Sequence, residues 1–267
     1  MKTLIGIVAV LAAGAVAAPG VAWAEIGQRM SDKDVKSVFE ALDHARDRFE
    51  DQLDGQLKNA TIRGPRGEVN VRQALEDYQT NLKNLRERFT ASNSASREAL
   101  VVLEQGGAMQ KFLEGYERQI KGRSEFDQLA SELGRLAQAY GVTFPMAEGA
   151  APRRYNDMEV ANMASSLATK ADLLKKEIEK DKGMEKADKQ AVKSDLEQFK
   201  KLAGTLKSRV SGDNPATSEA RQLMDMGTKI GQFVGAHQLA GNAWGSLRSG
   251  LDTLALAFGG QQASVVH

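Results

Sequence analysis

The chain contains no cysteine. That absence excludes disulfide bonds, thiolate metal sites, covalent c-type haem attachment and a cysteine nucleophile. A folded protein of this composition must therefore rest on its hydrophobic core alone, and a chain of 267 residues is long enough to bury one.

Proline and aromatic residues are scarce. After Pro19, only Pro65, Pro145, Pro152 and Pro215 remain, and each falls between stretches of helical periodicity, where a residue without an N–H does least harm. The chain is rich in alanine, leucine, glutamate, lysine, glutamine and arginine, and its β-branched residues do not alternate. This composition predicts an all-α fold.

Only the first residues form a long apolar run. Lys2 precedes the apolar stretch Leu4–Ala18, Pro19-Gly20 interrupts it, and Ala22-Trp23-Ala24 offers small residues at a cleavage site. This pattern predicts a secretory signal peptide over 1–24, cut after Ala24, and hence a periplasmic or secreted protein. No later run approaches the ~20 apolar residues of a membrane span, so no transmembrane segment is expected in the mature chain.

Neither sign of charge dominates. The chain has 36 Lys and Arg against 35 Asp and Glu, and Lys2 is the only charge within 1–24, so the mature chain is formally neutral. A nucleic-acid binder normally carries a basic surplus, and so does a protein that binds acidic lipid surfaces. Both classes of partner are therefore disfavoured.

Apolar residues recur at intervals of three and four in eight stretches, which places each set on one helical face. The second and sixth stretches share the same spacing throughout. The expected helices cover approximately Val35–Leu53, Val71–Phe89, Leu100–Ile120, Phe126–Tyr140, Val160–Ile178, Val192–Val210, Ser218–Ala240 and Trp244–Phe258.

The two halves of the chain resemble each other. Without gaps, Val71–Ala99 and Val192–Ala220 are identical at nine of 29 positions, and Glu125–Gly141 and Ala243–Gly259 at seven of 17. Such similarity in the same order predicts a tandem duplication of an antiparallel four-helix unit. The expected organisation is a first unit over 25–148, a second unit over 149–259 and a disordered tail over 260–267.

Polar residues shared by the halves suggest helix ends. Asn93 and Asn214 are placed to begin a helix, with Pro215 at the first helical position. Gly141 and Gly259 are placed to end one, because glycine adopts the left-handed conformation at little cost.

Glycine recurs every fourth residue in the seventh expected helix, at Gly227, Gly231 and Gly235. Each glycine inside a helix costs ~1 kcal/mol relative to alanine, so the stripe requires a reason. One interpretation is a buried helix packed tightly against its neighbours. The others are a self-association face or one wall of a ligand cavity.

If the glycine stripe is one wall of a ligand cavity, three residues with rings are candidates to contact the ligand. His237 and Trp244 would supply its polar and aromatic contacts, and Tyr116 is the first-half equivalent of His237. A single histidine beside an apolar helical face is also an ordinary packing residue. These residues are candidates for a ligand site or for packing.

Arginine flanks a Gly-Pro turn in the connection 62–68 between the first two expected helices. Arg63 and Arg66 there would suit an anion or the carboxylate of a partner, or would simply be solvated on an ordered turn. The connection lacks the Gly-Lys-Ser/Thr ending of a phosphate-binding loop.

Glu40, His44 and Asp47 share one helical face, but their spacing differs from the Glu-x-x-His of di-metal bundles and no second helix offers a matching histidine. A solvated, salt-bridged face is the preferred interpretation, and neither a metal nor a cofactor is expected. Because no catalytic constellation is visible, the sequence favours a non-catalytic periplasmic adaptor, scaffold or chaperone-like module that binds protein partners or itself. The alternative is a binder of a small apolar or amphipathic ligand in a bundle cavity.

Overall fold

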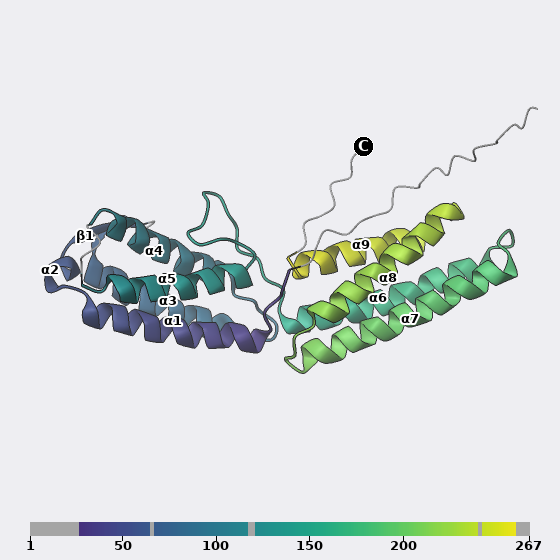
Figure 1. Ribbon diagram of the computed structural model, residues 1–267, viewed down its shortest axis with the longest axis horizontal. Helices are drawn as coiled ribbons and strands as arrows, with labels where there is room; N and C mark the ends of the chain where they lie inside the picture. Colours follow the sequence, from purple (N-terminus) through teal and green to yellow (C-terminus); the bar gives the residue numbers. More distant parts are fainter. Residues whose placement is uncertain (1–26, 65–66, 117–120, 240–241, 260–267) are drawn as a thin grey trace, which may run out of the picture.

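The computed structural model describes residues 27–64, 67–116, 121–239 and 242–259. The fold is mostly helical, which confirms the all-α prediction. The expected signal peptide 1–24, the tail 260–267 and Arg66 lie outside the described residues. The long helices form two groups that lie end to end (Figure 1).

The first group is a bundle of four long helices with a small addition at its far end. Its core consists of apolar residues from Val35 to Tyr140, and each long helix contacts two others around it. The elements are α1 (Asp32–Gln52), α2 (Gly55–Lys58), β1 (Thr61–Gly64), β2 (Gly67–Asn70), α3 (Val71–Arg88), α4 (Ser96–Glu114) and α5 (Arg123–Ala139).

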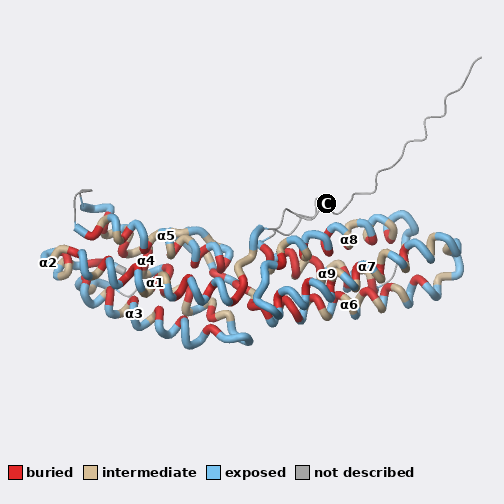
Figure 2. The backbone as a smooth tube through the Cα atoms, turned by 60° about the horizontal axis from the view of Figure 1, so that its bottom comes forward, coloured by how far each residue is buried: buried red, intermediate tan, exposed pale blue. Residues whose placement is uncertain are grey.

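The second group repeats this cyclic arrangement around a separate core, which extends from Val160 to Phe258. Its elements are α6 (Asp157–Lys180), α7 (Lys186–Ser211), α8 (Thr217–Ala236) and α9 (Asn242–Ala257). Buried residues follow the inner side of every long helix in both groups (Figure 2), as the three-and-four spacing predicted.

A β-hairpin replaces the surface turn expected around Arg63. Strands β1 and β2 pair antiparallel, with Ile62 opposite Val69. Ile62 is 2% exposed and belongs to the core, and Gly67 adopts a φ of +107° at the turn. The β-branched residues Thr61, Ile62 and Val69 favour a strand, so the prediction of helix on both sides of a simple turn was wrong here.

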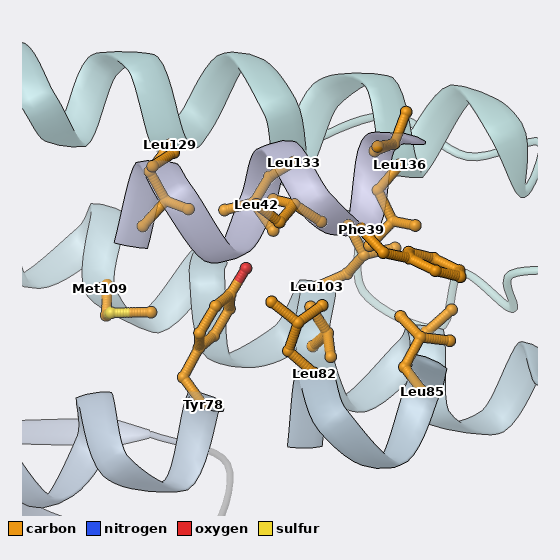
Figure 3. Close-up of a cluster of buried hydrophobic side chains, with 14 of the residues drawn as sticks. Phe39, Leu42, Tyr78, Leu82, Leu85, Leu103, Met109, Leu129, Leu133 and Leu136 are labelled. Carbon is orange, nitrogen blue, oxygen red and sulfur yellow. The ribbon is translucent and has the colours of Figure 1, made fainter. Parts of the chain in front are cut away.

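Tyr78 marks the middle of the first core (Figure 3). Its ring is fully buried, its hydroxyl points toward the side formed by Leu42, Leu129 and Leu133, and that hydroxyl has no hydrogen-bond partner among the described residues. Burial raises the pKa of the Tyr78 phenol far above its usual range, so the group stays protonated.

Of the predicted helix ends, the two C-terminal glycines are confirmed and the two N-terminal asparagines are wrong. Gly141 and Gly259 follow α5 and α9 with φ of +70° and +71°, the left-handed conformation expected after a helix end. Asn93 and Asn214 were wrongly assigned as N-caps. Both lie in turns that precede α4 and α8, whose first residues come three positions later, and Pro215 therefore also precedes its helix.

The two groups meet at the N-termini of α1 and α6, through a reciprocal set of contacts. Arg29 donates to Asp157 Oδ1 at 2.5 Å, and Arg154 donates to Asp32 Oδ1 at 2.7 Å. The backbone N–H of Asp32 donates to Asp157 Oδ2 at 2.8 Å, and that of Asp157 to Asp32 Oδ2 at 2.9 Å. We call these four residues the clasp. Each aspartate thus caps the first turn of the other group's helix.

Backbone hydrogen bonds beside the clasp follow the same reciprocal pattern. Gly27, which precedes α1, donates its N–H to the Phe258 carbonyl at the end of α9, at 2.8 Å. Arg153, which precedes α6, donates to the Tyr140 carbonyl at the end of α5, at 2.9 Å. Each group therefore binds the segment that leads into the other group, as in a contact between partners related by a two-fold axis.

We expect Arg154→Ala to lower the free energy of unfolding by about 3–5 kcal/mol, because the substitution leaves the Asp32 carboxylate largely buried without its principal cation. Urea unfolding followed by circular dichroism measures the loss. Arg153→Ala is the matched control, since Arg153 is exposed and outside the clasp. Equal effects of the two substitutions would contradict a stabilising role for the clasp.

Candidate functional site

Tyr116 and His237 lie at the surface, just beyond the ends of α4 and α8. Each packs against a phenylalanine four residues earlier, Tyr116 with tilted rings and His237 with stacked rings. The Phe112–Tyr116 ring centroids are 4.9 Å apart, and the Phe233–His237 centroids are 4.1 Å apart. The two rings occupy equivalent positions beyond α4 and α8, but they belong to different bundles and do not line one cavity.

His237 is held by two acceptors. Its Nδ1 lies 3.0 Å from the Phe233 carbonyl oxygen, and its Nε2 lies 3.3 Å from Asp188 Oδ2. The backbone hydrogen bond and then the Asp188 carboxylate raise the pKa of His237 above its usual value of 6.5. These contacts therefore stabilise the fold at acidic pH, and their contribution is lost as the pH rises through the pKa of the folded state. They form an ion pair at the end of a helix.

The glycine stripe of α8 accommodates side chains of α9. A Cβ at Gly227 would lie 2.5 Å from Leu251 Cδ1, and one at Gly231 would lie 2.7 Å from Trp244 Cζ2. Gly235 is exposed, and a Cβ there would meet nothing within 4 Å. Two of the three glycines thus fit the tight-packing interpretation, and Gly235 takes no part in it.

The first bundle contains the same packing of a leucine against a helical glycine, which was not predicted. A Cβ at Gly106 of α4 would also lie 2.5 Å from a leucine Cδ1, that of Leu133 in α5. Gly106 precedes Gly227 by the same 121 residues that separate Arg88 from Arg209. Extending the ungapped alignment by seven residues beyond Ala99 would have found it.

We expect Gly227→Ala to destabilise the protein by about 1–3 kcal/mol, because the new methyl group overpacks against the buried Leu251. Gly235→Ala is the matched control in the same helix, where the methyl group is free and alanine favours helix by up to about 1 kcal/mol. Thermal unfolding compares them. A Gly227→Ala protein as stable as the control would refute the overpacking.

Trp244 lines a pocket at the far end of the second bundle. The pocket has a volume of about 320 Å³ and lies between the end of α6, Leu239 and Trp244. Four of its seven lining residues are apolar and three are charged. The apolar residues are Leu174, Ile178, Leu239 and Trp244, and the charged ones are Glu177, Lys180 and Asp181.

Arg63 is exposed on the hairpin and forms an ion pair with Glu68, the residue opposite it in the β-register. Arg63 is therefore solvated as one interpretation expected, although it lies in a β-strand and not in a simple turn. Arg63 also lies at one edge of a shallow groove of about 770 Å³ between α4 and the segment 145–150. The groove mixes acidic, basic and apolar residues.

The expected solvated face of α1 carries Glu40, His44 and Asp47, all of them exposed. Asp47 pairs with Arg46 at 2.7 Å. Across the described ranges, no group of three or more histidine, aspartate or glutamate side chains is placed to hold a metal ion. Within those same ranges, no helix is both long enough and apolar enough to cross a bilayer.

The clasp was not predicted, although its signal is present in the sequence. Arg29-Met-Ser-Asp32 and Arg154-Tyr-Asn-Asp157 both read Arg-x-Ser/Asn-Asp, and in both the aspartate is the first residue of a helix. In both, the third residue is an N-cap within a capping box, Ser31 with Asp34 and Asn156 with Glu159.

Comparison with known proteins identified no matching family model, no similar curated protein and no similar solved structure. The assignment of a function therefore depends on this chain's own residues.

Proposed function

We propose that this protein is an exported, non-catalytic adaptor or scaffold that holds two helical units in a fixed relative orientation. The observation that carries the proposal is the clasp. Its four side chains are at most 12% exposed and join the two bundles through charge-assisted hydrogen bonds. Burying four charged side chains costs desolvation free energy, and a flexible linker without that cost would suffice if the relative orientation of the two bundles were unimportant.

We further propose that the units arose by tandem duplication, with boundaries near 25–148 and 149–259. Equivalent contacts in the two bundles support it. The Arg88–Glu98 pair of the first bundle corresponds to the Arg209–Glu219 pair of the second, at 3.6 Å and 2.8 Å. The glycine-to-leucine packing between α4 and α5 recurs between α8 and α9. Shared amphipathic periodicity alone does not account for such matched contacts.

Export is proposed from the residues 1–24, which have the order of a signal peptide, and from the absence of cysteine, which leaves a stable fold independent of redox conditions. Residence in a bacterial periplasm fits this pattern.

An adaptor needs different surfaces on its two units, and the bundles differ at their far ends. The first has the hairpin and the groove beside α4. The second has exposed ion pairs between α6 and α7, such as Lys175–Glu197 at 2.8 Å and Lys193–Glu179 at 3.0 Å. Holding two such surfaces at a set distance increases the effective concentration of one partner near the other.

The test is site-specific photo-crosslinking in the host, with the photoreactive residue at Ala147 in the first unit or at Lys182 in the second. We expect protein adducts of defined mass at both positions, and weaker adducts in an Arg29→Ala, Arg154→Ala variant whose bundles remain helical by circular dichroism. Arg153→Ala is the control for loss of an arginine at the junction.

Adducts of unchanged yield in the clasp variant would contradict the need for a fixed orientation. Native mass spectrometry of the same preparations provides the second readout. Absence of any adduct together with a co-purifying small molecule would replace the adaptor by the ligand-binding alternative, and a chain that retains residues 1–24 would contradict cleavage after Ala24.

A further inference from the structure

The pocket beside Trp244 has a filled counterpart in the first bundle. The interval of 125 residues between Asp32 and Asp157 also separates Phe49 from Leu174. The interval of 118 residues between Leu133 and Leu251, which make the equivalent glycine contacts, also separates Phe126 from Trp244. Two walls of the pocket therefore correspond to Phe49 and Phe126.

In the first bundle these two positions close the space between α1 and α5. The Phe49 and Phe126 rings meet edge to face, with centroids 5.3 Å apart and planes at 63°. Both rings are at most 2% exposed. The contact is the preferred geometry of an aromatic pair inside a protein core.

In the second bundle one member of this pair is missing. Leu174 takes the place of Phe49 and is itself buried, but an isobutyl group is smaller than a benzyl group. Trp244 takes the place of Phe126, and its indole is close to Gly231, where a Cβ would lie only 2.7 Å from Cζ2. The smaller Leu174 leaves space where the first bundle has the Phe49 ring, and Leu174 and Trp244 both line the pocket of about 320 Å³.

We propose that this pocket binds a small ligand that carries an aromatic ring, which takes the position of the Phe49 ring and packs against Trp244. Leu174, Ile178 and Leu239 provide the apolar walls that such a ring requires. An enclosed apolar cavity of about 150 Å³ is enough for benzene. The larger, partly open pocket here admits a ring with a short polar substituent that can reach Glu177, Lys180 or Asp181.

The inference does not depend on the adaptor proposal, because it concerns one end of one bundle. Trp244 provides the readout, since the only other tryptophan is Trp23 within the expected signal peptide. Protein purified from the host is titrated with benzyl alcohol, and with cyclohexylmethanol as the matched saturated alcohol, while tryptophan emission is recorded.

We expect a saturable change in emission with benzyl alcohol, and binding of cyclohexylmethanol weaker by about threefold or more, because only the aromatic ring gains the edge-to-face contact. Leu174→Phe copies the residue found in the first bundle, so it should fill the pocket, abolish the response and raise the melting temperature. Leu173→Phe is the matched control, because Leu173 is 48% exposed on the same helix and does not line the pocket.

Three results would overturn the inference. The first is the absence of a saturable response in the unmodified protein. The second is an undiminished response in Leu174→Phe, which would locate binding elsewhere. The third is equal binding of the two alcohols, which would remove the preference for an aromatic ring.

Discussion

Two helices that meet at their N-termini bring together two positive dipole ends and two sets of unpaired N–H groups. The carboxylates of the clasp neutralise the dipole ends and accept hydrogen bonds from these N–H groups. Each of Asp32 and Asp157 accepts from the other helix's first N–H and from the other group's arginine. Burial and the neighbouring Arg154 lower the pKa of Arg29, which shows the desolvation that the two carboxylates must offset. The end-to-end arrangement of the bundles depends on this exchange.

Near the clasp the two bundles are alike, and away from it they diverge. The capping boxes and the left-handed glycines recur in both. At the far ends the first bundle has a short helix and a hairpin where the second extends α6 and α7. The aromatic pair of Phe49 and Phe126 closes one end, and Leu174 with Trp244 leaves the other open. Shared structure thus lies at the junction, and the candidate functions lie at the unlike ends.

Helices with three-and-four spacing were predictable because burial selects one face along many residues. The hairpin was not found because β1 and β2 have only four residues each, too few for alternation to stand out. The clasp was not predicted because Asp32 and Asp157 are 125 residues apart in the sequence and only folding brings them together. The glycine stripe was recognised, but which glycines face a side chain depends on where Leu251 and Trp244 lie. Sequence therefore predicted elements, and missed contacts between distant elements.

If the clasp fixes the two bundles relative to each other, the distance between them must have a single well-defined value. In this cysteine-free chain, Asn84→Cys on α3 and Thr205→Cys on α7 place spin labels at exposed, equivalent positions. Double electron–electron resonance then reports the distribution of distances. We expect one narrow distribution that becomes broad when Arg29 and Arg154 are replaced by alanine. A distribution that is already broad with the clasp intact would contradict a fixed orientation of the bundles.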